Sequence, residues 1–415
     1  MRFLLLLIFL LLIENGNAQN SGQTIGFHFK SPTQKRLKMK YKRANNLIIV
    51  PCILNNKDKD TLNFVLDTGV SYTLITDTFL KYVYNLNCNR TIKINGLGGK
   101  EPIEACVANI DNISIGGEIV ANLHNVVILN DDVLHISEYA GMKIHGLIGA
   151  DLFQRFVVHL RYTDEFLMFE KPEYFKVPSK KYKELPITIE AQKPYLLADL
   201  VLEKDSLANA KFLLDTGAGH SLLLEQDSDK AIQIPTKNLE GYLGVSLSGV
   251  IKGHIGRVKK MVIKDIQLTE IITNFPDTAS IKASKGYIKR NGNIGSGIMK
   301  KFHWIFDYSR NKVWIKKNHY FKDRFEFSTS GLEIVGIAPT YQTFAIGSVR
   351  ENSPAEKAGL EKGDEFIFIE TYKVTELNIN QAYNLINKKS GKKVVCVIRR
   401  NGLLMAKTLI TEEPI

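Results

Sequence analysis

The chain is poor in cysteine and has no clustered metal ligands. Its 415 residues include four cysteines, at positions 52, 88, 106 and 396, and no Cys-x-x-Cys pair. Four cysteines are too few for a disulfide framework, and no Cys/His cluster suggests a metal, so we expect neither a metal nor a cofactor. Cys88 and Cys106 flank a glycine-rich turn and could be bridged across a hairpin. Cys52 and Cys396 are typical of single core positions in strands.

Only the first residues form a long apolar run. Arg2 precedes the run from Phe3 to Ile13, which is followed by polar and small residues up to Ala18. This pattern is typical of a secretory signal peptide over residues 1–18, cut after Ala18, and the run is too short to span a bilayer comfortably. The sequence therefore predicts an exported protein of the periplasm or the extracellular space, with no membrane span.

The positive net charge lacks the arginine-rich tail or basic-aromatic module of a nucleic-acid-binding protein. The charge is +12, with lysine and arginine spread along the chain. Solvated lysines explain this better than a nucleic-acid partner, although a basic surface could favour anionic cell-envelope material. With 44% hydrophobic and 24% charged residues, the composition is that of a globular protein with an ample core. The length suggests two or three domains.

One eight-residue phrase occurs twice, at residues 64–71 (FVLDTGVS) and 212–219 (FLLDTGAG). Each copy is an apolar run, typical of a buried strand, that ends in Asp-Thr-Gly. An acid at the end of a buried strand is costly unless something pairs with it or uses it. One copy could be a structural turn in which the aspartate bonds its own backbone. Two copies favour a functional pair, Asp67 and Asp215.

The second half of the chain repeats the pattern of the first. From Asn46 the pattern is all-β, and each half ends its series of strands with a short apolar segment followed by glycine, at Gly149 and at Gly295. The offset between the halves is 148 residues at the aspartates and 146 at these glycines. An offset this constant indicates duplication rather than chance matches.

These motifs resemble the aspartic proteases of the retropepsin-like and pepsin-like kind. The resemblance covers roughly Asn46 to Asn318. It implies a mainly β protein with two homologous β-barrel lobes, residues 46–172 and 183–318, preceded by a polar lead-in over residues 19–45. It also implies that Asp67 and Asp215 are the catalytic pair.

The resemblance assigns supporting roles to the neighbours of the two aspartates. Hydroxyl groups of Thr68 and Thr216 would cross-brace the two loops. Gly69 and Gly217 would let backbone approach the carboxylates. The apolar segments that contain Gly149 and Gly295 would brace the loops from below. Asn293 departs from the family pattern, because it takes the first apolar position of the second brace.

The chemistry of such a pair requires two copies of the motif. Two carboxylates about 3 Å apart cannot both ionise, so they hold one proton between them. The charged partner acts as general base on a water, and the protonated partner donates to the scissile carbonyl. The sequence therefore predicts an aspartic endopeptidase that acts on peptide or protein substrates. A pair within one chain needs no dimer, and we expect a monomer.

Two glycine-rich hairpins are candidates for flaps that clamp an extended peptide and exclude water. The first contains Gly96, Gly98 and Gly99, and the second contains Gly244 and Gly249. Pepsin-like enzymes have a tyrosine in the first flap, and this chain has none there. Tyr242 of the second hairpin is either a substitute or an ordinary strand tyrosine.

The last segment, residues 326–411, resembles the α+β PDZ domains of bacterial exported proteases. Its signature is residues 353–367 (SPAEKAGLEKGDEFI), where a proline opens a short helix and glycines end it and turn into a strand. The pattern predicts an amphipathic helix over residues 379–388 and a hairpin about Asn401-Gly402. The resemblance implies that a peptide's terminal carboxylate binds at a segment with three site residues, Gly331, Leu332 and Ile334.

Other functions stay open from the sequence. Glu333 adds a negative charge to the proposed carboxylate site, and the PDZ-like segment could serve only to stabilise the second lobe. The whole chain could also be a catalytically weak peptide-binding or scaffold protein of the cell envelope. Retained peptide binding without cleavage would favour that alternative. Salt-sensitive binding to anionic envelope material would favour a scaffold that uses its basic face.

Overall fold

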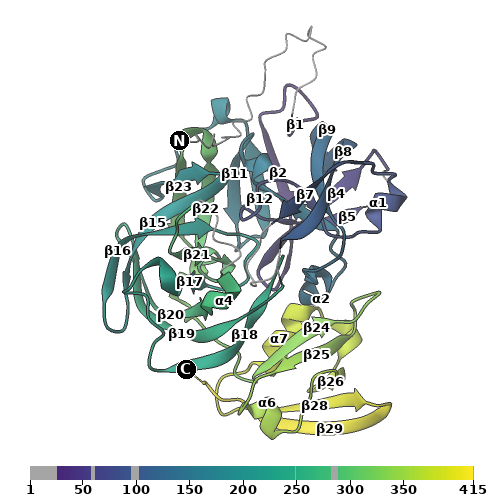
Figure 1. Cartoon of the computed structure of the whole chain (residues 1–415), viewed down its shortest axis with the longest axis vertical. Coiled ribbons are helices and arrows are strands. Elements are labelled where there is room, and N and C mark those ends of the chain that lie inside the picture. The colour runs from purple at the N-terminus through teal and green to yellow at the C-terminus, as the bar shows by residue number, and fades with distance from the viewer. Residues whose placement is uncertain (1–25, 58–60, 95–101, 248, 282–287, 415) are drawn as a thin grey trace, which may run out of the picture.

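The computed structural model describes residues 26–57, 61–94, 102–247, 249–281 and 288–414. Strands dominate and form four sheets (Figure 1). Two of these sheets close into barrel-like rings, a third joins them, and the fourth belongs to a C-terminal unit, residues 326–414. This confirms the mainly β class and the two barrel-like lobes. The predicted signal peptide lies outside the described residues.

The first sheet closes into a ring because the strand Ile103–Ile115 pairs with Ile119–Leu129 on one side and with Leu47–Leu54 on the other. In order around the ring, the strands are β4 (Leu47–Leu54), β5 (Leu62–Leu66), β10 (Gly146–Ile148), β6 (Leu74–Ile75), β9 (Ile119–Leu129) and β8 (Ile103–Ile115). Outside the ring, three strands pair with its members: β1 (His28–Phe29), β3 (Lys42–Ala44) and β7 (Cys88–Ile94). A disulfide between Cys88 and Cys106 ties β7 to β8. Closure leaves the ring without open edges, and its interior is filled by apolar side chains.

The second ring has the same order of pairings and the same strand directions at each step. Its strands are β15 (Lys193–Val201), β16 (Ser206–Leu214), β21 (Gly292–Ile294), β17 (Leu222–Leu224), β20 (Ile266–Pro276) and β19 (Gly249–Ile263). Two further strands pair with the ring, β14 (Thr188–Glu190) and β18 (Asn238–Ser246). In both rings a short strand lies parallel to the strand that ends in Asp-Thr-Gly.

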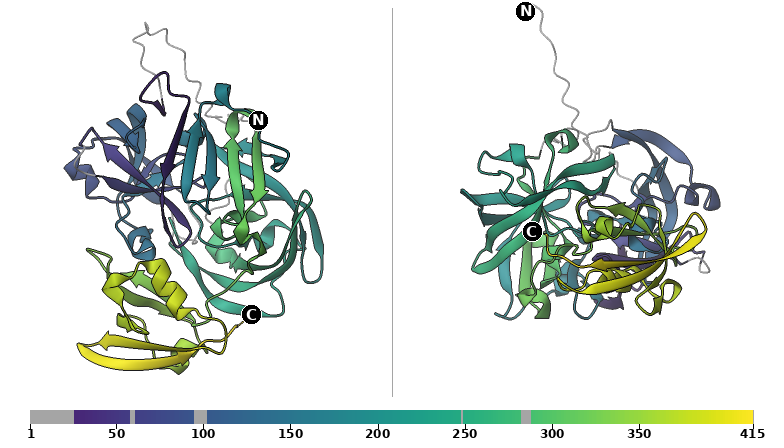
Figure 2. Two further views of the ribbon diagram at one scale, coloured as in Figure 1. Left: turned by 180° about the vertical axis from the view of Figure 1, so that it is seen from behind. Right: turned by 90° about the horizontal axis from the view of Figure 1, so that it is seen from below.

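A six-stranded sheet joins the lobes (Figure 2, left). Its strands, in order, are β13 (Lys183–Pro186), β23 (Lys312–Lys317), β22 (Phe302–Asp307), β11 (Val157–Arg161), β12 (Phe166–Glu170) and β2 (Arg36–Lys40). The link between the lobes is the antiparallel pairing of β11 with β22. The strand β2 comes from the polar lead-in. One hydrophobic core, which includes the fully buried Trp304, extends through this sheet and both rings.

The C-terminal unit contains one sheet and two helices. Its strands are β24 (Leu332–Gly336), β25 (Phe344–Val349), β26 (Glu365–Ile369), β27 (Tyr372–Lys373), β28 (Lys393–Arg400) and β29 (Leu403–Ile410), and its helices are α6 (Pro354–Lys357) and α7 (Ile379–Ile386). The predicted hairpin about Asn401-Gly402 is confirmed, since both residues have positive φ, as a two-residue type I′ turn requires. Asn378 and Gln381 form a capping box at the start of α7.

The remaining helical segments are short. They are α1 (Leu80–Val83), α2 (Ile136–Ala140), α3 (Ala150–Phe153), α4 (Thr278–Ile281), α5 (Ser296–Met299), η1 (Pro172–Tyr174), η2 (Gln226–Ser228), η4 (Tyr308–Arg310), η5 (His319–Lys322) and η6 (Val374–Glu376). Within the described ranges, no helix has the length and apolar character needed to cross a membrane.

The C-terminal unit packs on the first lobe. Helix α2 lies beside β24 and above α7 (Figure 1). The two units share an apolar cluster that includes Leu147 of the first lobe and Ile334 of the C-terminal unit. Asn380 of α7 bonds the chain next to β3, since its Oδ1 accepts from the Asn45 N–H at 2.8 Å and its Nδ2 donates to the Arg43 carbonyl at 2.9 Å.

Candidate active site

The two Asp-Thr-Gly segments begin where β5 and β16 end. The N–H of Asp67 donates to the Ile148 carbonyl at 2.9 Å, and the N–H of Asp215 donates to the Ile294 carbonyl at 3.0 Å. These carbonyls belong to β10 and β21, the short strands that run parallel to β5 and β16. Gly149 and Gly295 are the residues that directly follow Ile148 and Ile294. A side chain at Gly295 would overlap the His220 carbonyl. The brace segments therefore hold both aspartate backbones in place.

Threonines link the two segments across the interface between the lobes. The Thr68 hydroxyl donates to the Leu214 carbonyl at 2.6 Å and accepts from the Thr216 N–H at 3.1 Å. Reciprocally, the Thr216 hydroxyl donates to the Leu66 carbonyl at 2.7 Å and accepts from the Thr68 N–H at 3.0 Å. Both threonines are completely buried. These four bonds fix the position of one lobe's aspartate relative to the other's.

The two carboxyl groups face each other across Gly69 and Gly217. The Gly69 N–H donates to Asp67 Oδ1 at 2.7 Å, and the Gly217 N–H donates to Asp215 Oδ1 at 3.1 Å. A methyl group on Gly69 would lie 2.9 Å from Oδ1 of both aspartates, and one on Gly217 would overlap the Asp67 carboxyl. Glycine is therefore required at both positions by close approach. The carboxyls are close enough for the charge of Asp215 to raise the pKa of Asp67.

Burial and like charge govern the protonation of the pair. Burial and, after it, the neighbouring charge of Asp215 raise the pKa of Asp67 to about 7, against the opposing effects of the Gly69 N–H and the Lys193 ammonium. Asp67 is only 8% exposed. A carboxyl of this pKa beside a second carboxyl keeps one shared proton from moderately acidic pH up to near neutrality.

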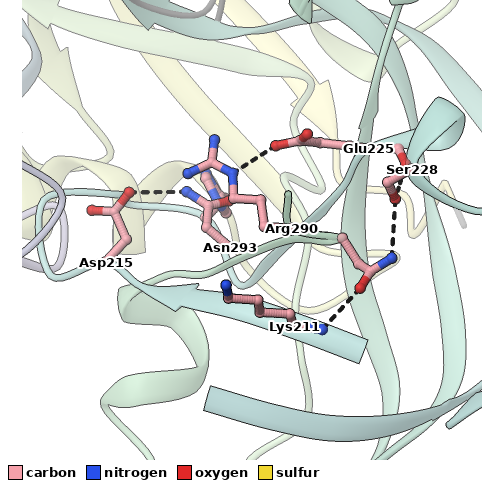
Figure 3. Close-up of polar contacts among 8 residues, drawn as sticks. Lys211, Asp215, Glu225, Ser228, Arg290 and Asn293 are labelled. Atoms are coloured by element: carbon pink, nitrogen blue, oxygen red, sulfur yellow. Dashed lines mark hydrogen bonds and ion pairs between the residues drawn. The ribbon is translucent and has the colours of Figure 1, made fainter. Parts of the chain in front are cut away.

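A polar pair adjoins Asp215 and has no counterpart beside Asp67. The side-chain amide of Asn293 donates to Asp215 Oδ2 at 2.9 Å (Figure 3). The His220 ring Nε2 lies 2.9 Å from Asn293 Oδ1. From the sequence, Asn293 is a departure from the apolar brace, and the sequence gives no signal for His220 as its partner. The signal that marks Asn293 is a polar residue at a buried strand position where the first copy has Leu147.

Sequence reasoning also missed two basic residues near the pair. Arg290 Nε bonds Glu225 Oε1 at 2.7 Å (Figure 3). Burial lowers the pKa of Arg290, but its bond to Glu225 and, to a smaller extent, the charge of Asp215 raise it. Lys193 begins β15; burial lowers its pKa, and the charges of Asp67 and Asp215 oppose this. Neither lies near Asp215 in the sequence, so only the fold reveals them. Across the described ranges, no group of three or more His, Cys, Asp or Glu residues could hold a metal.

The flap candidates divide into two groups. Gly96, Gly98 and Gly99 lie outside the described residues. Gly244 and Gly249 lie in the β18–β19 hairpin, where Gly244 follows a bulge and both have positive φ. Leu247, near the tip, packs on the apolar cluster shared by the first lobe and the C-terminal unit. The second hairpin thus reaches the region where all three units meet.

The backbone amides of the proposed carboxylate site are already bonded. The N–H groups of Gly331 and Leu332 donate to the hydroxyls of Ser328 and Ser330, at 3.0 and 3.2 Å. The Ile334 N–H donates to the Tyr383 hydroxyl of α7 at 2.9 Å, and that hydroxyl donates back to the Ile334 carbonyl at 3.2 Å. Tyr383 therefore closes the edge of β24 toward α7.

Comparison with known families supports an aspartic-peptidase role for the first Asp-Thr-Gly segment. A family model described as aspartyl protease matches residues 50–152, which include Asp67, Thr68, Gly69 and Gly149. The match supports an aspartic-type peptidase. An aspartic-type peptidase is a hydrolase whose substrates are peptides.

Comparison with individual proteins adds little to this. No curated protein matches the chain at a significant level. Among solved structures, the chain is similar to a photosystem II D1 C-terminal processing protease, with 22% sequence identity and a TM-score of 0.20. The similarity covers 20% of this chain and 23% of that one, so this chain spans about a quarter of that protein's length.

Proposed function

We propose that this chain is an exported aspartic endopeptidase that cleaves peptide or protein substrates with a water activated by Asp67 and Asp215. The observation that carries the proposal is the reciprocal threonine bonding, which brings one carboxyl from each ring to a single point. Such a pair, buried and holding one proton, is suited to acid–base catalysis of hydrolysis.

The mechanism uses the shared proton twice. In the first step the carboxylate takes a proton from water as the water oxygen bonds the scissile carbonyl carbon. The carboxylic acid gives its proton to the carbonyl oxygen, which yields a neutral gem-diol. In the second step the newly formed acid protonates the amide nitrogen as the carbon–nitrogen bond breaks. The other carboxylate accepts a hydroxyl proton from the gem-diol, so the pair returns to its starting charge.

Export and a monomeric state are part of the same proposal. The apolar run that starts at Phe3 and the small residues up to Ala18 support a signal peptide. The Cys88–Cys106 disulfide supports an oxidising compartment, the periplasm or the extracellular space. Both catalytic carboxyls come from one chain, so a monomer suffices. The β18–β19 hairpin and the segment that contains Gly96 are proposed as flaps over an extended substrate.

The C-terminal unit is proposed to be a PDZ-like module that binds peptide or protein C-termini between β24 and α7. The sequence signature at residues 353–367 supports this, as does the position of α7 beside β24. Because Tyr383 occupies the Ile334 backbone groups, a ligand strand must first displace that side chain. The groove is thus closed in the described state.

The test of the enzyme is cleavage of a quenched-fluorescent peptide mixture by residues 19–415 between about pH 3 and 7. We expect a bell-shaped pH profile, inhibition by a hydroxyl-containing transition-state mimic, and loss of at least a thousandfold in kcat/KM for both Asp67→Asn and Asp215→Asn. Cleavage that is indifferent to both substitutions would show that the pair is not the catalytic centre. Peptide binding without cleavage at any pH would favour a binding protein instead.

A further inference from the structure

The two halves of the site differ at two corresponding positions. Where the second copy has Asn293 and His220, the first copy has Leu147 and Tyr72. Leu147 is an apolar core residue, and the Tyr72 side chain is 54% exposed. Asn293 is only 4% exposed and bonds both Asp215 and His220. A buried amide at an apolar brace position costs free energy unless it is bonded, so its bonds to the pair call for a functional reason.

The direction of these bonds follows from the orientation of the Asn293 amide. Its Nδ2 donates to Asp215 Oδ2, and its Oδ1 faces the His220 ring. His220 must then donate through Nε2–H. Both hydrogen bonds, from His220 to Asn293 and from Asn293 to Asp215, therefore donate in the direction of the Asp215 carboxyl. This arrangement stabilises negative charge on Asp215, whereas Asp67 lacks an equivalent side-chain donor among the described residues.

We propose that Asn293, oriented by His220, is a positioning residue that makes Asp215 the ionised base of the pair and leaves the shared proton on Asp67. The inference rests on the proposed function and deepens it by giving the two carboxyls unequal roles at the start of the reaction. In that state Asp215 activates the water and Asp67 protonates the carbonyl.

Of the two basic groups near the pair, Arg290 interacts with Asp215 and favours this assignment, whereas Lys193 interacts with both carboxyls and does not distinguish them. Lys193 approaches both carboxyls from β15, and Arg290 precedes β21 while paired with Glu225. Tyr162 is completely buried, and burial together with the charge of Asp215 raises its pKa, so it stays neutral. Burial lowers the pKa of His220, and the charge of Asp215 opposes this. His220 is therefore neutral near neutral pH and donates one hydrogen, the one that faces Asn293.

The test is the pH dependence of kcat/KM for Asn293→Leu, which places in the second copy the residue that the first copy has. Loss of a hydrogen bond to a charged group should raise the acidic limb of the profile by about one pH unit. The basic limb should move less. His220→Phe should shift the acidic limb in the same direction by a smaller amount, and His220→Gln, which retains an amide donor, should restore part of it.

Two further variants control for a purely structural effect. Asn291→Ala removes a nearby asparagine that bonds Lys211 and Ser228 instead of the carboxyls, and it should leave the acidic limb in place. Leu147→Asn introduces the amide beside Asp67 and should move the basic limb to lower pH. Thermal unfolding of each variant shows whether it is folded. If Asn293→Leu does not fold, the His220 variants carry the test.

The outcomes separate this inference from the proposed function. An active wild type whose acidic limb is unchanged in both Asn293→Leu and His220→Phe overturns the inference and leaves the dyad enzyme standing. Equal limb shifts in Asn291→Ala also overturn it, because they would show a general structural effect. A wild type that cleaves nothing overturns both. The acidic-limb shift in Asn293→Leu and His220→Phe alone, with partial recovery in His220→Gln, supports it.

Discussion

Asp67 shows how a single buried carboxyl sets both reactivity and stability. The fold places it beside Asp215 with 8% exposure, where burial and like charge raise its pKa to about 7. In the unfolded chain an aspartate titrates near its ordinary pKa of 3.8. The native state therefore binds this proton more tightly than the unfolded state. The stability associated with it is present at low pH and is lost as pH rises from about 4 toward 7.

Replacing this carboxyl should flatten part of the pH dependence of stability. We expect the wild-type free energy of unfolding to fall between pH 4 and 7, and Asp67→Asn to remove on the order of a few kcal/mol of that fall. Urea denaturation at several pH values measures it. Asp131→Asn, at an exposed carboxyl, should follow the wild-type curve. An Asp67→Asn curve parallel to the wild type would show that Asp67 is not the group that holds the proton.

Individual elements were predictable where their signals are local. The hairpin at Asn401-Gly402 follows from turn chemistry, and the helix predicted over residues 379–388 is α7, which ends at Ile386. The six-stranded sheet was not predicted, because β11 and β22 pair across some 145 residues and a strand pattern does not specify its partner. The role of Asn293 could not be predicted for the same reason, because it depends on contacts with Asp215 and His220 that form only in the fold. The Asp-Thr-Gly motifs could be interpreted from the sequence because the residues that define them are adjacent.

The edge of β24 offers a test at the scale of one element. Removal of the Tyr383 hydroxyl frees the Ile334 N–H and carbonyl toward α7. We expect Tyr383→Phe to bind an apolar peptide with a free C-terminal carboxylate about fivefold more tightly than the wild type, because the competing bond is gone. Fluorescence polarisation measures this. Tyr372→Phe, at an exposed tyrosine, is the control. Unchanged affinity, or equal binding of the C-amidated peptide, contradicts a carboxylate-binding groove at β24.

At the scale of the molecule, α2 joins the C-terminal unit to the region around Asp215. Tyr139 of α2 donates from its hydroxyl to the Asn45 carbonyl at 3.3 Å, and the same hydroxyl leaves no room for a side chain at Gly219. Gly219 lies two residues beyond the second Asp-Thr-Gly. At the C-terminal end of α2, Gly141 fits against Ile379 and Phe344. We therefore expect a change in how the C-terminal unit docks to reach the loop that carries Asp215.

Gly141 is the position that tests this connection. It has φ of 61°, and an added methyl would lie 2.9 Å from Ile379 Cβ, so Gly141→Ala should loosen α2 from α7. Gly117→Ala is the matched control, since that glycine has φ of 75° and no atom within 4 Å of the added methyl. Both variants should lose about 1 kcal/mol to backbone strain. Only Gly141→Ala should speed hydrogen exchange in α2 and α7 and lower kcat/KM severalfold. Equal behaviour of the two variants would mean that docking and catalysis are independent.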